Sequence, residues 1–380
     1  MDWFVFLKEV RMESFNIDAL AEQCQEDTQL FGIMFVLLSK CNHNCIHCYI
    51  PEHSSDGLSS EVICRLIDEA RELGALNVTF TGGEILLRPD LIDLVRYARS
   101  KFMRVFLMSN GYALTEGIIK ELAALHISEF STTIYAMDPI VHDKITGVPG
   151  SFHKTMCNVA LLKKRGIDVT VKTPLMEYNK FSYRDVESFA RKNGFSFRTT
   201  PTIFSRTNGD RTPHHFEIRD NLRQIVHETD RINKQYRGEL VVQNNGEIPC
   251  SAGHSSICIN YDGIAWPCNT LTLDVGNILK QSLRDIWINS EPLNEWRREC
   301  RKIPHKCADC YLYSRCVRCP GLAYMEDDDL YGCSSSAKKL LSKGQFKERS
   351  CTMKKYCKPV IVERKTVISC GCGQGTCNGK

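Results

Sequence analysis

The chain has 380 residues, of which 43% are hydrophobic and 25% are charged, and its formal net charge is +4. This length allows one large domain and a smaller one, each with its own core. The charge is too small to indicate a nucleic-acid surface, and no apolar run approaches the roughly 18 residues of a membrane span. Because the N-terminus lacks a secretory signal pattern, we expect a cytoplasmic protein without nucleic-acid or membrane partners.

From about residue 31 to about residue 230, short runs rich in β-branched and aromatic residues alternate with longer segments of helical period. The alternation predicts a parallel sheet whose functional loops gather at the C-terminal ends of the strands. The predicted strands are 32–39, 75–81, 102–109, 127–135, 167–173 and 195–200. The predicted helices are 59–74, 90–100, 115–126, 151–166 and 182–194.

The chain contains 20 cysteines, and three of them, Cys41, Cys45 and Cys48, directly follow the first predicted strand. A cytosolic protein keeps its thiols reduced, so clustered cysteines indicate metal sites more than disulfides. Three thiolates can hold three irons of a 4Fe-4S cubane and leave the fourth iron open, whereas structural zinc takes four protein ligands. A zinc site that borrows a nearby histidine remains the alternative, from His43, His47 or His53.

Three short motifs follow successive predicted strands: "CNHNCIHCY" at 41–49, "TGGE" at 81–84 and "SNG" at 109–111. Together they resemble the radical S-adenosylmethionine (SAM) superfamily. The resemblance implies a partial (β/α)6 TIM-like barrel in which SAM chelates the open iron of the cluster held by Cys41, Cys45 and Cys48. In that family the reduced cluster passes an electron to SAM, and the resulting 5′-deoxyadenosyl radical abstracts hydrogen from the substrate.

Further SAM contacts are carried over from the same resemblance. Gly82 and Gly83 permit close approach of the backbone, and Glu84 or the adjacent carbonyls accept hydrogen bonds from the SAM ammonium group. His47 stands where many relatives carry an aromatic residue against the adenine. The other expected contacts are Ser109, Asn110, Thr133 with Ser131 as second choice, and Lys172 toward the SAM carboxylate. A lysine that reaches solvent is the alternative for Lys172.

After about Gln243, turn residues, aromatics and cysteines replace the alternating pattern. Eight cysteines there suit two further cubanes. The segments "CSAGHSSICINYDGIAWPC" and "CADCYLYSRCVRC" resemble a SPASM domain, the auxiliary-cluster module of radical SAM enzymes. The resemblance implies one cluster on Cys250, Cys258, Cys268 and Cys319, and a second on Cys307, Cys310, Cys316 and Cys333. A zinc ribbon is the alternative, and Cys300 is a competing ligand of lower rank.

These motifs divide the chain into an N-terminal segment, a radical SAM barrel, a SPASM domain and a Cys/Gly-rich tail, expected at residues 1–30, 31–242, 243–335 and 336–380. The isolated Cys24, Cys64 and Cys157 are expected to be small core residues. No family counterpart matches the tail cysteines, for which metal binding, thiol chemistry and a disordered tail all stay open. They are Cys351, Cys357, Cys370, Cys372 and Cys377.

Enzymes that resemble this whole arrangement modify peptides or proteins through crosslinks, thioethers or side-chain oxidation. The resemblance therefore implies a ribosomal-peptide maturase with SAM and three 4Fe-4S clusters. Asn269 stands where sulfatase-maturing relatives carry a proton-accepting Asp, and an amide cannot act as a base, so that activity is disfavoured.

Because only some 30 residues precede the first strand, we expect a separate leader-peptide-binding protein if the substrate has a leader. The resemblance also implies an external electron donor such as flavodoxin or ferredoxin. Two other classes stay open: a radical SAM oxidoreductase that acts on a small molecule or a free amino acid, and a non-enzymatic iron–sulfur or zinc protein.

Overall fold

The computed structural model describes residues 16–237, 247–310, 316, 318–343, 361–362 and 365–366. Its main sheet has nine strands in the order β6-β5-β4-β3-β2-β1-β7-β8-β9. The first six are parallel and confirm the six predicted strands. They span Gly32–Val36 (β1), Asn77–Thr81 (β2), Arg104–Met108 (β3), Glu129–Thr133 (β4), Val169–Pro174 (β5) and Ser196–Thr200 (β6).

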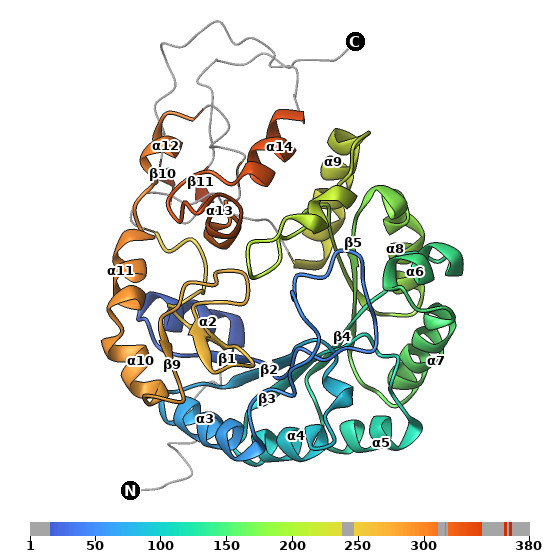
Figure 1. Cartoon of the computed structure of the whole chain (residues 1–380), viewed down its shortest axis with the longest axis horizontal. Coiled ribbons are helices and arrows are strands. Elements are labelled where there is room, and N and C mark those ends of the chain that lie inside the picture. The colour runs from blue at the N-terminus through green and yellow to red at the C-terminus, as the bar shows by residue number, and fades with distance from the viewer. Residues whose placement is uncertain are drawn as a thin grey trace, which may run out of the picture.

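Helices follow the strands around the outside of the sheet, as Figure 1 shows. Two of them begin at residues whose hydroxyl accepts a backbone N–H, Ser59 before α3 and Thr115 before α5. Short 3-10 helices lie at Ile85–Leu87 (η1), Glu177–Asn179 (η2) and Thr212–Phe216 (η3). The α-helices are Ile17–Glu26 (α2), Ser60–Glu72 (α3), Leu91–Ser100 (α4), Glu116–Ala124 (α5), Pro139–Thr146 (α6), Ser151–Lys164 (α7), Tyr183–Lys192 (α8) and Leu222–Arg237 (α9).

The core lies between the strands and these helices because one face of each strand is apolar. On β1, Ile33 and Phe35 are buried, and they belong to the same cluster as Leu66 of α3. Side chains on alternate residues of a strand point to opposite faces. The other face carries half-buried residues, and there Lys172 Nζ of β5 lies 3.5 Å from Met108 Sδ at the end of β3.

The sheet continues into the Cys-rich part of the chain. Strand β7 (Ser256–Ile259) pairs in parallel with β1, in the register Gly32↔Ser256. Strands β8 (Ile264–Trp266) and β9 (Gly276–Asn277) then add in antiparallel order. The hydrogen-bonded sheet therefore crosses the boundary expected near residue 243, and the limits of the two domains stay a prediction.

The remaining helices are Leu283–Asn289 (α10), Glu291–Glu299 (α11), His305–Ala308 (α12), Pro320–Asp327 (α13) and Ser335–Lys343 (α14). Ser290 separates α10 from α11 and caps the latter, whose first turn contains Pro292. Helix α14 contacts α9 and α13, so the start of the expected tail is helical and packed. Two short strands, Ile361–Val362 (β10) and Lys365–Thr366 (β11), pair with each other.

The isolated cysteines differ in their burial. Cys24 is buried as predicted and Cys64 is half-buried, but Cys157 is exposed, so its prediction as a core residue was wrong. The buried face of α7 contains Thr155, Val159 and Leu162, and Cys157 falls outside this face. The five tail cysteines and residues 1–15 lie outside the described residues. Within the described part of the chain, no helix has both the length and the apolar composition of a membrane span.

Candidate metal and cofactor centre

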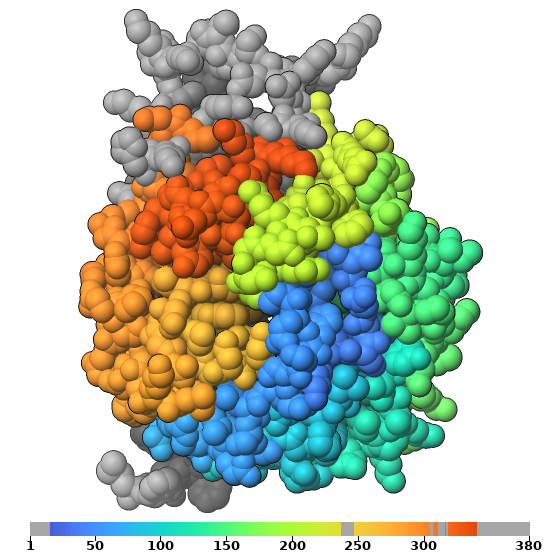
Figure 2. Space-filling model, viewed as in Figure 1, coloured from blue at the N-terminus to red at the C-terminus, as the bar shows by residue number. Residues whose placement is uncertain are grey.

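The loop after β1 carries Cys41, Cys45 and Cys48 at the C-terminal end of the parallel strands. Backbone hydrogen bonds hold this loop on two sides, from Glu84 N to Lys40 O at 2.8 Å and from Asn44 N to Thr146 O at 2.9 Å. In Figure 2 the blue segment that contains the loop reaches the surface between yellow-green and gold segments of the later chain. The Cys loop is thus bordered by both predicted domains.

The three thiols are half-buried and close enough for the charge on one to act on another. Burial is the main cause that raises the pKa of Cys41 to about 11 and that of Cys45 to about 12, and the neighbouring thiols add to both shifts. Burial also raises the pKa of Cys48. Thiols in this state need a cation to become thiolates, and iron supplies that charge. The donor set therefore fits an iron–sulfur cluster.

Tyr135 and His53 contact the predicted ligands directly. The Tyr135 hydroxyl lies 3.6 Å from Cys45 Sγ, and His53 Nε2 lies 3.5 Å from Cys48 Sγ. His47, the residue expected against the adenine, contacts Tyr135 as well, because its Nε2 lies 2.8 Å from the Tyr135 hydroxyl. Sequence reasoning missed Tyr135 as a neighbour of the ligands, since no motif connects position 135 with the Cys loop.

Arg206, on the loop after β6, was also missed. Its positive charge acts on Cys48 and lowers the pKa of that thiol against the larger effect of burial. The next residue, Thr207, donates its backbone N–H to Tyr49 O at 2.9 Å, which holds this loop against the Cys loop. Arg206 comes close to Cys48 because the loop after β6 folds over the loop after β1. The sequence around Arg206 does not indicate this contact.

Glu84 is fully buried and its carboxylate binds inside the protein. Oε1 accepts hydrogen bonds from Leu86 N at 2.9 Å and Ser109 Oγ at 2.7 Å, and Oε2 accepts one from Asn110 N at 2.8 Å. Burial raises the pKa of Glu84, while these three hydrogen bonds lower it. The carboxylate thus joins the TGGE and SNG segments. Acceptance of the SAM ammonium group by Glu84 or by the adjacent carbonyls stays a prediction.

Gly82 and Gly83 bring TGGE against the Cys loop. A Cβ atom on Gly83 would lie 2.2 Å from Lys40 O and 2.3 Å from Ser39 O, and Gly82 has a φ of 152° with a Cβ position 2.7 Å from Leu38 O. Real Cβ atoms do not approach backbone oxygens so closely, so both positions require glycine. The close approach that the sequence predicted toward SAM is made, in the structure, to the loop that carries Cys41.

The other expected SAM contacts lie along the ends of β3, β4 and β5. Asn110 Nδ2 donates to Asn42 Oδ1 at 2.7 Å, which ties SNG to the Cys loop. Thr133 is half-buried and pairs in register with Lys172, whereas Ser131 is buried and donates to Glu129 at 2.6 Å. Lys172 is also half-buried: burial lowers its pKa, and Glu129 partly offsets this. The direction of Lys172 toward Met108 does not match the solvent alternative, and contact of these residues with SAM stays a prediction.

The eight downstream cysteines were expected to form two sets, and within each of these sets the charges of some members act on others. In the first set, the charge of Cys268 raises the pKa of Cys250, Cys258 and Cys319, although burial is the larger cause for each. In the second set, burial and then the charges of Cys333, Cys307 and Cys310 raise the pKa of Cys316 to about 11. Folding thus brings together thiols that lie up to 69 positions apart, from Cys250 to Cys319. Their ligand roles remain a prediction.

Cys300 lies near the first set. Its Sγ is 3.0 Å from His254 Nε2, and the charge of Cys250 adds to the burial that raises its pKa to about 12. It therefore stays a competing ligand. Arg318 lies between the two sets, because its charge lowers the pKa of Cys319 in the first and of Cys307 in the second.

Within the described ranges, no group of three or more His, Cys, Asp or Glu side chains is arranged as the ligands of a single metal ion. A cubane places each thiolate on a different iron, so its ligands lie farther apart than those of one ion. This result concerns sites for one ion, and the ligation of clusters by the cysteine sets stays a prediction.

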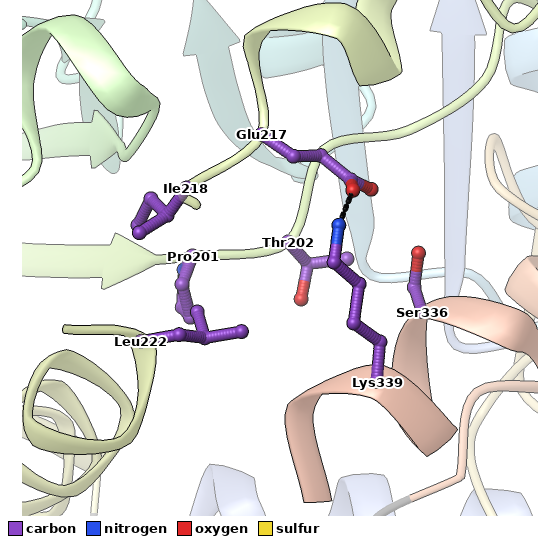
Figure 3. A pocket seen from close by; sticks show the side chains of 7 residues that line it. All are labelled: Pro201, Thr202, Glu217, Ile218, Leu222, Ser336 and Lys339. Atoms are coloured by element: carbon purple, nitrogen blue, oxygen red, sulfur yellow. Dashed lines mark hydrogen bonds and ion pairs between the residues drawn. The ribbon is translucent and has the colours of Figure 1, made fainter. Parts of the chain in front are cut away.

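A further polar chain resembles a hydrolase triad. Ser205 Oγ lies 2.9 Å from His214 Nε2, and His214 Nδ1 lies 2.7 Å from Glu217 Oε1. Ser205 is completely buried, so no substrate reaches it as a nucleophile. Figure 3 shows Glu217 and Lys339 of α14 pointing toward each other beside a small pocket. This series of polar contacts therefore connects the loop after β6 to α14. The other residues that line this pocket are Pro201, Thr202, Ile218, Leu222 and Ser336.

Comparisons with known proteins agree with this arrangement. Residues 35–192 match the model of the radical SAM superfamily, and residues 250–311 match an iron–sulfur cluster-binding domain, SPASM. The chain is 25% identical over 331 residues to the AdoMet-dependent heme synthase of Methanosarcina barkeri, which covers 78% of this chain and 93% of that protein. It is 24% identical over 291 residues to the PqqA peptide cyclase of Ruegeria pomeroyi, over 72% of this chain and 78% of the relative.

Solved structures show the same fold. Streptococcus suis SuiB bound to its precursor peptide SuiA superposes with a TM-score of 0.64 at 15% identity, and the match covers 84% of this chain and 79% of SuiB. The two matched domains confirm the predicted kinds of cofactor, SAM and iron–sulfur clusters. With its Cys loop at the end of β1 and its Cys-rich module joined to the same sheet, the chain is a radical SAM enzyme that carries a SPASM domain.

Proposed function

We propose that this enzyme modifies a peptide or protein substrate by radical chemistry, through a crosslink, a thioether or the oxidation of a side chain. In the proposal, Cys41, Cys45 and Cys48 hold the SAM-binding cluster, and the two sets of four cysteines hold one auxiliary 4Fe-4S cluster each. When bound, the first cluster and SAM supply the 5′-deoxyadenosyl radical that removes a substrate hydrogen.

The observation that supports the proposal is that thiols of the Cys loop, and thiols within each of the two proposed downstream sets, raise one another's pKa. A set of three leaves one iron for SAM, while a set of four closes a cluster to exogenous ligands. The closed clusters are suited to taking up the electron that the substrate releases when a new bond or double bond forms. Arg318 supports this role, since its charge lies between both sets.

Residues of the barrel would orient the reaction. Lys172 and Glu129 place a half-buried positive and negative charge on the face of the sheet opposite the helices. A charged pair of this kind can hold the backbone or a polar side chain of a substrate, and a confined cavity limits side reactions of a radical. The peptide cyclase named above and SuiB, which was solved with a precursor peptide, support a peptide as the substrate class.

A second candidate is the modification of a small molecule, in particular a tetrapyrrole. The heme synthase similarity favours it, because the match covers 93% of that relative. The two candidates share the radical step and differ in what occupies the barrel.

The deciding experiment uses anaerobically reconstituted protein. We expect about 12 irons per chain, the sum of three four-iron clusters, and release of 5′-deoxyadenosine from SAM under reducing conditions. Short precursor peptides encoded beside the gene would then be tested for loss of hydrogen mass, in parallel with an iron tetrapyrrole assayed for heme by absorbance. Conversion of the tetrapyrrole but of no peptide would replace the first candidate by the second, and zinc without visible absorbance would overturn both.

A further inference from the structure

A basic pocket lies at the opposite end of the strands from the Cys loop. It has a volume of about 360 Å³ and opens between the turn after α2, the segment before β7, and α11 with the residues that follow it. Thr28 precedes β1, His254 precedes β7, and these two strands are parallel, so the pocket is at their N-terminal end. The residues that line it are Thr28, His254, Asn294, Arg297, Arg298 and Arg301.

The positive charge of this pocket is only partly neutralised. Arg298 pairs with Glu291 at 2.8 Å, but Arg301 has no ion-pair partner among the residues that the structure describes. Arg297 donates only to neutral acceptors, which include Gly253 O at 2.7 Å and Trp287 O at 2.6 Å. Burial lowers the pKa of Arg297 to about 10, and no carboxylate offsets this effect. A buried guanidinium without a counter-charge is costly.

Two buried nitrogen atoms of the pocket residues also lack a hydrogen-bond partner in the described part of the chain: Arg297 Nη2 and His254 Nδ1. His254 is completely buried, and its other ring nitrogen is occupied by Cys300 Sγ at 3.0 Å. Buried polar atoms in native proteins nearly always have a partner, and exceptions need an explanation such as a missing ligand. An acceptor from outside the chain would satisfy both the charge and the hydrogen bonds.

We propose that this pocket binds a small oxyanion, a phosphate or carboxylate group, at a site separate from the SAM centre. Arg301 and Arg298 would contact the oxyanion with their guanidinium groups, whose paired N–H donors match two oxygens of such a group. Asn294 would add an amide contact, and Arg297 beneath it would supply charge. Because His254 connects this pocket with Cys300 and thereby with the first auxiliary cysteine set, the ligand would lie next to that set.

The test measures binding of inorganic phosphate and of succinate to the reconstituted holoenzyme by calorimetry, at constant ionic strength and with saturating SAM. We expect one of the two ions to bind, which identifies the ligand as phosphate-bearing or carboxylate-bearing. Arg301→Gln should weaken that binding about tenfold or more, because a hydrogen bond to a charged group is lost. The matched control is Arg284→Gln, which removes an exposed arginine on α10 outside the pocket and should leave the affinity unchanged.

Arg301→Lys keeps the charge but loses the paired donors, so we expect an intermediate affinity. If Arg301→Gln does not fold, Arg298→Gln tests the same wall of the pocket. Absence of binding of either ion to the wild-type holoenzyme would overturn the proposal, as would equal loss of affinity in the Arg284 control. Binding that is seen only when SAM is omitted would place the ion in the SAM centre and would also overturn the proposal.

Discussion

Replacement of Ser109 by Ala tests whether the buried network around Glu84 holds the predicted SAM centre together. The Ser109 hydroxyl donates to Glu84 Oε1 at 2.7 Å and accepts the backbone N–H of Gly111 at 3.0 Å. The change removes one oxygen and leaves almost no cavity. A hydrogen bond to an ionised group contributes about 1.5–3 kcal/mol, and a buried N–H left without a partner costs about 1–3 kcal/mol.

Because these two terms share one site and are not fully additive, we expect a loss of about 2–4 kcal/mol in the free energy of unfolding. In a barrel of this size, that loss lowers Tm by about 4–16 °C. The assay is thermal unfolding followed by circular dichroism, without SAM, on protein reconstituted in parallel with wild type. Ser100→Ala is the matched control, because Ser100 is an exposed residue at the end of α4 whose hydroxyl contacts only Tyr97 O nearby.

A Tm of Ser109→Ala equal to that of wild type would refute the reasoning. Weaker SAM binding at an unchanged Tm would instead assign the hydroxyl to direct contact with SAM, as the sequence resemblance implies. A drop in both quantities fits the network, since loss of the Ser109 bond displaces Asn110 and Gly111 as well.

Four further predictions address the clusters, the glycine contacts and a buried histidine. Replacing Cys41, Cys45 and Cys48 together by Ala should remove about four irons per chain and abolish 5′-deoxyadenosine formation, and SAM cleavage at the wild-type rate would show the assignment to be wrong. Cys310→Ala should leave uncoupled SAM cleavage intact and stop substrate modification in the same soluble sample, whereas unchanged modification would mean that Cys310 is not a needed ligand. Gly83→Ala should lower Tm because its Cβ would lie 2.2 Å from Lys40 O. Gly117→Ala in the first turn of α5, where the new Cβ would lie 3.8 Å from Thr115 Oγ1, should raise stability by about 0.4–1 kcal/mol. Equal effects of the two changes would contradict the close contact at Gly83. Burial lowers the pKa of His142 from 6.5 to about 4, so the folded state resists protonation of this side chain, and the free energy of unfolding should fall as the pH drops from 6.5 toward 4, by about 1–2 kcal/mol at pH 5.5. A His142→Gln variant should lose this part of the pH dependence. An identical pH profile for the variant and the wild type would count against the prediction.

The sequence alone determined the six parallel strands, five of the helices between them and the place of the Cys loop, whereas α6 (Pro139–Thr146) was not predicted. These features are local: β-branched runs and helical periods report which residues of a short segment face the core, and a parallel sheet then brings the C-terminal ends of the strands together. Cys157 shows the limit of this reasoning, because the apolar period of a helix does not decide on which face of the helix a single residue such as Cys157 lies. Its neighbours Thr155 and Val159 are buried, and Cys157 is exposed.

Only the tertiary structure decided how the motifs are used. It joined β7 to β1, directed the Glu84 carboxylate to Ser109 and Asn110, and placed Tyr135 and Arg206 beside the predicted ligands. Each of these contacts joins residues far apart in the chain, and no local pattern encodes such a pairing. The physical reason is that a buried carboxylate or thiol takes whichever partners the packed strands and loops bring within hydrogen-bonding or Coulombic range, so its role is settled by the fold as a whole.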